Sequence, residues 1–273
     1  MITELIRPAV LEGRDLHLGY GGADVVAGMD VTITTGSFTV IVGPNACGKS
    51  TLLRSLSKVL PPRAGHVLLD GKQIAMMRPK AFARQVGFLA QSSIAPEGIT
   101  VHELVSRGRY PYQSVLHQWS DEDDAQVSAA MARTHVDDLA RRRVAELSGG
   151  QRQRVWIAMA LAQETDILLL DEPTTYLDIA NQLEILDLVT DLNQRRGTTV
   201  VMVLHDLGLA ARYSHQLVAM RDGGILACGT PQEVVTVETV HAVFGIDSLV
   251  ITDPVSGSPL VMPIGRHHAT QLT

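Results

Sequence analysis

The chain has 273 residues, of which 45% are hydrophobic and 19% are charged, and this ordinary globular composition excludes extensive disorder away from the ends. Its 23 Lys and Arg residues against 29 Asp and Glu residues give a formal net charge of −6, which excludes nucleic-acid binding over a broad basic surface. The apolar runs at 167–170 and 200–204 are far shorter than the roughly 20 residues that cross a bilayer. We therefore expect a soluble protein, and its two cysteines, too few for a disulfide framework, favour a reducing cytosol.

The first third of the sequence predicts strands and one helix. Segments 11–20, 25–34 and 37–42 alternate in strand fashion between glycine-containing turns, and we expect a small antiparallel sheet there. The third segment runs into the sequence GPNACGKST, which opens a helix that reaches about Lys58. The sequence LPPRAG then ends the helix, and 66–70 resumes a strand.

The middle of the chain predicts helices, and the part after it alternates. From about Ser92 to Arg143 strand signals vanish, and charged amphipathic patterns predict a helical insert with Ser120 as an N-cap. After Ser148 helices and strands alternate, which is typical of parallel β-α-β units. The expected helices are 151–163 and 179–196, and the expected strands are 167–171 and 199–204. The sequence therefore predicts an α/β fold with a parallel sheet.

Residues 43–50 fit the pattern G-x-x-x-x-G-K-[ST] directly after a predicted strand and before a predicted helix. In this phosphate loop the glycines let the backbone wrap around phosphates, Lys49 reaches the β- and γ-phosphate oxygens, and Ser50 offers an oxygen to Mg²⁺. A glycine-containing turn that binds nothing is the alternative, and the strand–helix context disfavours it. The predicted nucleoside triphosphate site comprises Gly43, Pro44, Asn45, Ala46, Cys47, Gly48, Lys49, Ser50 and Thr51.

The sequence ILLLDEP at 167–173 predicts the second half of this site. A carboxylate at the end of a buried strand is costly unless it serves a charged group. We expect Asp171 to hold the Mg²⁺ shell and Glu172 to polarise a water molecule for attack on the γ-phosphate. An acidic turn without function is the alternative, and the phosphate loop upstream disfavours it.

A second glycine-containing loop, AELSGGQRQR at 145–154, offers backbone N–H groups to an anion at the start of a helix. With LSGGQ at 147–151, the phosphate loop and ILLLDEP, the chain resembles the ATP-binding subunits of ABC transporters from about Leu11 to Gly245. The resemblance implies four further roles: a Mg²⁺ and water contact for Gln91 in FLAQ, a dimer-loop position for Asp178 in TTYLD, a γ-phosphate contact for His205 in VLHDL, and adenine stacking for Tyr20 in LGYGG.

The resemblance also implies the architecture. It implies a P-loop NTPase fold with a RecA-like parallel sheet core, a small N-terminal antiparallel β subdomain and an inserted helical subdomain. One ATP-binding domain is expected over 1–273, with the helical subdomain at about 92–150 and a short C-terminal extension at about 246–273.

The family's pairing of two chains accounts for the presence of two phosphate-binding loops. In a head-to-tail dimer the signature loop of one chain closes over the ATP held by the other, so each ATP is shared. The expected cofactors are ATP and Mg²⁺, with the metal held by Ser50, Gln91 and Asp171. The signature-loop residues expected to reach the partner's ATP are Ser148, Gly149, Gly150 and Gln151.

Two positions in the phosphate loop depart from the family pattern or invite separate chemistry. Ala46 stands where many members have glycine, and it is tolerated if its backbone is not left-handed. Cys47 lies beside a helix N-terminus and Lys49, both of which favour the thiolate, although a small buried residue without a redox role is the alternative. We expect a thiol reagent at Cys47 to block ATP hydrolysis.

The stretches TVHELVSRGRYPY at 100–112 and TTYLDIANQLEIL at 174–186 resemble the ATP-binding subunits of importers of ferric siderophores, haem and cobalamin. Siderophore import ranks first by family analogy, and haem or cobalamin import is the alternative. The resemblance implies a peripheral subunit on the cytoplasmic face of the membrane, with a second, identical ATP-binding subunit, a permease dimer and, indirectly, a substrate-binding protein as partners. Arg107, Arg109 and Tyr110 are expected to contact the permease, with a solvated helix face as the alternative.

Two other classes of protein fit less well. A non-transport ABC ATPase that acts on ribosomes or DNA generally has two cassettes or a long coiled-coil insert, whereas this sequence has one cassette, no sustained heptads and a negative charge, so no nucleic-acid partner is expected. A module that closes on ATP without hydrolysing it would not require Glu172 and His205.

Overall fold

The computed structural model describes residues 11–91, 93–114, 119–175 and 177–265. The ends of the predicted domain, 1–10 and 266–273, and the predicted start of the helical insert at Ser92 therefore lie outside the described residues.

A six-stranded central sheet has the order β10-β9-β3-β8-β7-β6. Its strands from β9 to β6 are parallel, and β10 pairs antiparallel with β9 at one edge. Three of the strands have the sequences FTVIV, ILLLD and TVVMV and are buried along their whole length, as expected for strands covered on both faces. The bounds are β3 (Phe38–Val42), β6 (Val86–Leu89), β7 (Ile167–Asp171), β8 (Thr199–Val203), β9 (Gln216–Arg221) and β10 (Gly224–Gly229). The predicted α/β class with a parallel core is confirmed.

A four-stranded antiparallel sheet has the order β2-β1-β4-β5. The prediction of an antiparallel sheet holds for 11–20 and 25–34 but is wrong for 37–42, because β3 lies in the central sheet between β8 and β9. Burial of β3 on both faces accounts for the difference, since β2 of the small sheet carries both buried and exposed residues along its length. The bounds are β1 (Leu11–Leu18), β2 (Val26–Ile33), β4 (Ala64–Leu69) and β5 (Lys72–Gln73).

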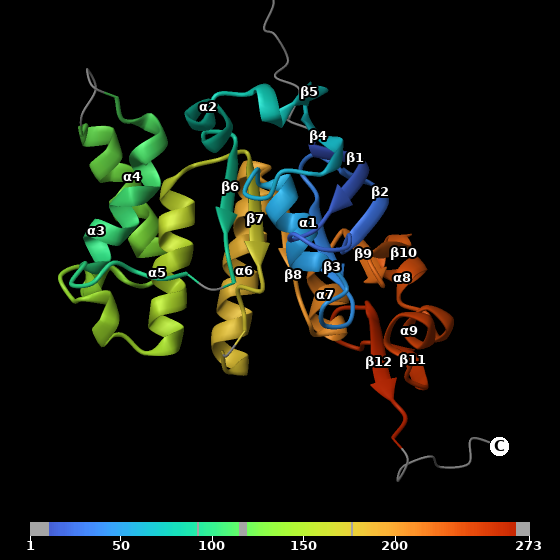
Figure 1. Cartoon of the computed structure of the whole chain (residues 1–273). Coiled ribbons are helices and arrows are strands. Elements are labelled where there is room, and N and C mark those ends of the chain that lie inside the picture. Colours follow the sequence, from blue (N-terminus) through green and yellow to red (C-terminus); the bar gives the residue numbers. More distant parts are fainter. Residues whose placement is uncertain (1–10, 92, 115–118, 176, 266–273) are drawn as a thin grey trace, which may run out of the picture.

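The helices form layers around the central sheet (Figure 1). Helix α1 (Lys49–Leu56) shares an apolar core with β1, β2 and one face of the central sheet, whereas α5 (Gly149–Ala162), α6 (Ile179–Arg196) and α7 (Leu207–Tyr213) share a second core with the other face. Successive side chains of β3 pack into the two cores in turn: Ile41 belongs to the first core, and Val40 and Val42 belong to the second.

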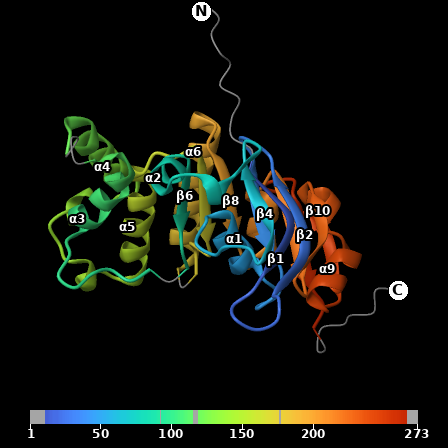
Figure 2. The ribbon, with the colours of Figure 1, turned by 45° about the horizontal axis from the view of Figure 1, so that its top comes forward.

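Helices α3 (Val101–Ser106) and α4 (Asp121–Arg133) pack beside α5 at the β6 end of the sheet, as both ribbon views show (Figure 2). The predicted N-cap of α4 is confirmed, because the Ser120 side chain accepts a hydrogen bond from the backbone of Asp123 in a capping box. The remaining elements are η1 (Ile74–Met76), α2 (Pro79–Ala83), η2 (Arg107–Tyr112), η3 (Asp137–Leu139), η4 (Val144–Glu146), α8 (Pro231–Val234), α9 (Val237–Phe244), β11 (Ser248–Thr252) and β12 (Pro259–Pro263). Within the described ranges, no helix is both long enough and apolar enough to cross a membrane.

Candidate functional site

The carboxyl ends of β3, β6, β7 and β8 meet at one edge of the central sheet and border a cavity of about 640 Å³. That volume suits a small-molecule ligand. From the phosphate loop the cavity is lined by Asn45, Ala46, Gly48, Lys49, Ser50 and Thr51. From the strand ends and the turn after β7 it is lined by Gln91, Glu172, Thr175 and His205.

The phosphate loop follows β3 directly and leads into α1. Gly43 has φ 151°, and a Cβ atom there would collide with the backbone carbonyl of Met220, so the close approach of the two segments requires glycine. Gly48, the N-cap of α1, has φ 105°. The Lys49 side chain folds back over the loop, where its Nζ donates hydrogen bonds to the carbonyls of Gly43 (2.9 Å) and Pro44 (2.8 Å). The loop thus holds its lysine in place with its own backbone.

A hydroxyl and a carboxylate meet at the floor of the cavity. The Ser50 hydroxyl donates a hydrogen bond of 2.8 Å to Oδ1 of Asp171, whose side chain is completely buried. Its other oxygen, Oδ2, has no hydrogen-bond partner among the described residues. Burial raises the pKa of Asp171, and the hydrogen bond from Ser50 opposes this in part. A buried carboxylate oxygen without a partner, next to a hydroxyl, is a donor set that fits a divalent cation such as Mg²⁺.

Three side chains surround the carboxylate of Glu172, which is 9% exposed. His205 Nε2 lies 2.7 Å from Oε1, Gln91 Nε2 donates to Oε2 at 2.6 Å, and the Thr175 hydroxyl donates to Oε2 at 3.1 Å. The Glu172 backbone is left-handed, with φ 51°, which is costly for a residue other than glycine and is typical of functional sites. Thr175 was not predicted from the sequence, although a hydroxyl three residues after a candidate base is a signal that could have found it.

The other predicted site residues lie apart from this cluster. Tyr20 is 55% exposed, and its hydroxyl accepts a hydrogen bond of 3.2 Å from Arg54. Asp178 caps α6 by accepting hydrogen bonds from the backbone and side chain of Asn181, which lower the pKa of its carboxyl.

The signature loop begins α5 and does not line the cavity described above. Ser148 and Gln151 form a capping box, in which the Ser148 hydroxyl accepts from the backbone of Gln151 and the Gln151 side chain accepts from the backbone of Ser148. Gly149 and Gly150 follow the cap in the first turn of the 14-residue helix. Their backbone N–H groups stand at the positive end of the helix, and neither glycine lines the cavity of the phosphate loop.

Ala46 was expected to be tolerated only if its backbone is not left-handed, and the structure does not meet this condition. Its φ of 62° is left-handed, a conformation that costs an alanine roughly 1–2 kcal/mol relative to a relaxed backbone. The alanine therefore carries strain that glycine would avoid, and the tight loop between Gly43 and Gly48 imposes it.

Cys47 does not show the thiolate character expected from its neighbours. The side chain is buried, and burial raises the pKa of its thiol, with the positive charge of Lys49 opposing this in part. Iodoacetamide should therefore label exposed Cys228 faster than buried Cys47, because burial both shields the Cys47 thiol and lowers its thiolate fraction. Mass spectrometry of peptides over time measures both rates.

Loss of ATP hydrolysis should follow the slow labelling of Cys47 and not that of Cys228. A Cys228→Ser variant supplies the control, since it should lose activity with the same time course. Equal labelling rates of the two cysteines would contradict the burial argument, and full turnover after Cys47 is labelled would contradict the block.

The prediction that Arg109 contacts a permease is wrong, because its side chain is inside the protein. Arg109 is 2% exposed and its Nε donates a hydrogen bond of 2.8 Å to Asp123 Oδ1. Its neighbours Arg107 and Tyr110 are exposed, and Lys80 lies over the Tyr110 ring at 4.6 Å from the centroid. The buried pair holds η2 against α4, and the exposed neighbours remain available to a partner.

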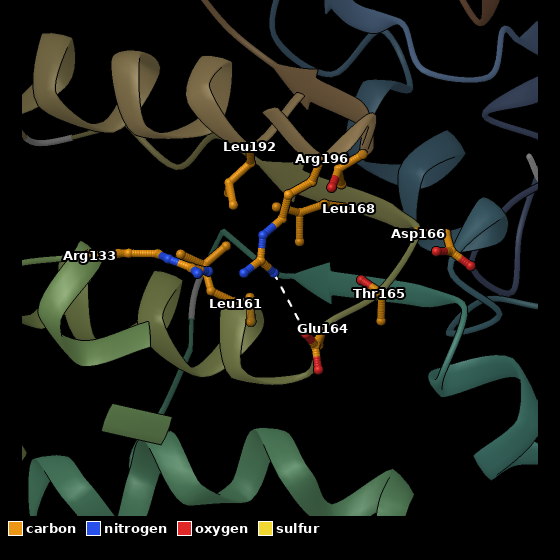
Figure 3. A pocket seen from close by; sticks show the side chains of 10 residues that line it. Arg133, Leu161, Glu164, Thr165, Asp166, Leu168, Leu192 and Arg196 are labelled. Atoms are coloured by element: carbon orange, nitrogen blue, oxygen red, sulfur yellow. Dashed lines mark ion pairs between the residues drawn. The ribbon is translucent and has the colours of Figure 1, made fainter. Parts of the chain in front are cut away.

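A second cavity, of about 130 Å³, lies at the amino ends of β7 and β8, at the edge of the sheet opposite the phosphate loop (Figure 3). Arg133 and Arg196 approach each other there, and Arg196 forms an ion pair of 3.7 Å with Glu164. Burial and the charge of Arg196 lower the pKa of Arg133. Both arginines lie in the last turns of their helices, where a positive charge is stabilised by the helix dipole, and Glu164 forms the ion pair with Arg196. The two like charges are therefore stabilised by groups of the protein itself.

Comparison with known proteins agrees with the geometry of the phosphate loop and the strand ends. The sequence profile described as "ABC transporter" matches residues 26–175. The chain is 55% identical to "Probable siderophore transport system ATP-binding protein YusV" of Bacillus subtilis (strain 168), over 94% of each chain. It is 52% identical to "Ferric enterobactin transport ATP-binding protein FepC" of Escherichia coli (strain K12), over 94% of this chain and 95% of the relative.

Among solved structures, the chain superposes on the dimeric bacterial ABC transporter cassette MJ0796 with a TM-score of 0.73 and 26% identity, over 81% of this chain and 98% of that one. This likeness places the parallel sheet, the antiparallel sheet and the helices in the architecture of P-loop ATPases. The profile covers more than half of the chain, and the relatives cover nearly all of it. The chain therefore belongs to the ABC transporter family, as one of its ATP-binding proteins.

Proposed function

We propose that this protein is the subunit that binds and hydrolyses ATP to power the import of a ferric siderophore. ABC transporter ATP-binding proteins are ATPases coupled to transport, and this chain is one of them. One observation carries the choice of cargo: two relatives that are 55% and 52% identical over nearly the whole chain are named for siderophore and ferric enterobactin transport. Haem or cobalamin import is the alternative for the cargo.

ATP is proposed to bind with its phosphates in the phosphate loop. Lys49 would exchange its hydrogen bonds to the loop carbonyls for the β- and γ-phosphate oxygens, and Tyr20 would stack on the adenine. Ser50 and Asp171 would hold Mg²⁺ together with Gln91, because the free Oδ2 of Asp171 and the adjacent hydroxyl match the oxygen ligands that this ion prefers. When bound, the ion neutralises charge on the phosphates.

Glu172 is proposed to act as the general base. Its carboxylate would accept a proton from a water molecule while the water oxygen forms a bond to the γ-phosphorus and the bond from that phosphorus to the bridging oxygen breaks, releasing ADP. His205 would leave Oε1 of Glu172 and donate to a γ-phosphate oxygen. The donors that surround the carboxylate support this assignment, since they place it at the cavity wall with a fixed direction.

The signature loop is proposed to act on the ATP of a second, identical chain. Its position outside the nucleotide cavity of its own chain supports this, because the N–H groups of Gly149 and Gly150 are then available to a partner's γ-phosphate. Asp178, at the dimer-loop position, would lie near the same interface. One solved relative of this fold is itself a dimeric cassette.

The transport partners are proposed from the relatives. Import ATP-binding proteins work with a membrane permease, so this chain would sit at the cytoplasmic face of the membrane against a permease dimer, with a binding protein delivering the cargo from outside. Exposed Arg107 and Tyr110 are candidate contacts for the permease.

Reconstitution with the permease encoded nearest to this chain tests the proposal. ATP hydrolysis is measured in proteoliposomes with a binding protein loaded with ferric siderophore, haem or cobalamin in turn. Stimulation by the siderophore-loaded protein alone is the expected result. Stimulation by haem or cobalamin instead would overturn the cargo but leave the ATPase assignment intact.

A further inference from the structure

Of the three side chains that donate to the Glu172 carboxylate, two are distant from Glu172 in the sequence and one is near. Gln91 follows β6 and lies 81 positions before Glu172, and His205 follows β8 and lies 33 positions after it. Thr175 lies in the turn that Glu172 itself begins: its backbone N–H donates to the carbonyl of Glu172 at 3.3 Å, and its hydroxyl donates to Oε2 at 3.1 Å. Thr175 is thus tied to Glu172 by both its backbone and its side chain.

The other two donors have competing partners once ATP is present. Under the proposed function Gln91 contacts Mg²⁺ and the attacking water, and His205 contacts the γ-phosphate. Gln91 and His205 must then share or give up their hydrogen bonds to Glu172. In the same scheme, Thr175 is assigned no contact with Mg²⁺, water or phosphate that would compete with its hydrogen bond to Glu172. Its hydroxyl would remain on Oε2 through the reaction.

A glutamate base needs such a tether. Its terminal torsion is broad, so the carboxylate turns freely unless an oxygen is held. A general base must also lie within hydrogen-bond reach of the proton that it removes, with its lone pair directed at the water. Holding Oε2 leaves Oε1, which contacts His205 Nε2 at 2.7 Å, as the oxygen that can accept a proton once His205 turns to the γ-phosphate.

We propose that Thr175 is a positioning residue for ATP hydrolysis, whose hydroxyl anchors Oε2 of Glu172 so that Oε1 accepts the proton of the attacking water. The proposal rests on the proposed role of Glu172 as the general base. It adds a residue that lines the cavity and, in the scheme above, acts through another side chain.

The test replaces the hydroxyl with a methyl group of the same shape. Thr175→Val should lower kcat for ATP about tenfold, which corresponds to roughly 1.4 kcal/mol in the barrier, while KM for ATP changes less than about twofold. Thr175→Ser, which keeps the hydroxyl, should restore most of the turnover. Phosphate release measures the rates, and thermal unfolding shows that the variants are folded. If Thr175→Val does not fold, Thr175→Ala removes the same hydroxyl.

The chain offers a matched control in the next residue. Thr174 is buried in the same turn, and its side chain has no hydrogen bond to Glu172 in the described structure. Thr174→Val should therefore leave kcat within about twofold of the unmodified chain. Thr175→Val with the turnover of Thr174→Val would overturn the proposal.

A double variant separates this proposal from the function on which it rests. In Glu172→Gln, the further change Thr175→Val should not lower the residual rate again, because residues that act as a unit are not additive. A second tenfold loss would show that Thr175 acts independently of Glu172 and would overturn the proposal. Full turnover of Glu172→Gln by itself would instead overturn the role of the base.

Discussion

The Glu172→Gln variant should bind ATP with nearly unchanged affinity and hydrolyse it about 10²–10⁴-fold more slowly than the unmodified chain, the factor typical of losing a general base. The amide keeps the shape of the side chain but does not accept a proton from water. The effect is large because the carboxylate is 9% exposed and three side chains contact it, so no solvent group replaces it. Since each ATP is proposed to be shared between two chains, slow hydrolysis should also make the variant accumulate as an ATP-bound dimer. Phosphate release and light scattering measure the two outcomes.

Glu184→Gln is the matched control for this variant. Glu184 lies on α6, exposed, in a surface ion pair of 3.2 Å with Arg154, and the same chemical change there should leave turnover unaltered. Turnover of Glu172→Gln equal to that of the control would remove Glu172 from the reaction. An unmodified chain that binds ATP and dimerises without releasing phosphate would instead favour the module that closes without hydrolysis.

The order of helices and strands was predictable from the sequence because their apolar patterns differ. The pairing of the strands was predictable only in part. Residues 37–42 follow two segments that do form an antiparallel pair, and alternation alone placed all three in one sheet. The run FTVIV carries the contrary signal, since a strand without a polar face must be covered on both sides. Pairing of β3 with β8 and β9, more than 150 residues later, is set by tertiary packing and not by any local pattern.

The cluster of polar residues at the strand ends was predictable in part, because the order of the strands in the sequence determines which loops lie at the same edge of the sheet. The loop after β3 and the acids after β7 meet because parallel strands end at the same edge, so the approach of Ser50 to Asp171 follows from topology. Backbone strain does not follow from residue type, which is why the left-handed φ of Ala46 was not foreseen. Burial likewise depends on distant segments: it outweighs the charge of Lys49 at the thiol of Cys47.

Arg109→Met should lower the free energy of unfolding at neutral pH by about 3–5 kcal/mol, the cost of leaving one partner of a buried ion pair alone. Asp123, its partner, is 4% exposed. Arg109 also donates to the carbonyl of Ala162 at 2.9 Å and stacks over the Tyr112 ring at 4.0 Å from the centroid, so it joins η2, α4 and the end of α5. Urea unfolding measures the difference. Arg107→Met, the same change at an exposed position two residues earlier, should cost less than about 0.5 kcal/mol.

The pH dependence of the free energy of unfolding shows whether Arg109→Met is destabilised by the lost ion pair or by lost packing. Burial alone would raise the pKa of Asp123, but hydrogen bonds from Arg109 and Ser120 hold it below its ordinary value of 3.8. The stability that this carboxylate contributes is therefore present above pH 3.8 and is lost as the pH falls through its lower folded pKa. In Arg109→Met the carboxylate stays buried without its cation, its pKa rises, and protonation on acidification relieves the penalty. The difference in free energy of unfolding between the unmodified chain and Arg109→Met should then narrow as the pH falls from 7 toward 4. Adding Asp123→Asn to Arg109→Met should recover part of the lost stability at neutral pH. A gap that stays constant with pH, with no recovery in the double variant, would assign the loss to packing of the Arg109 side chain and not to its charge.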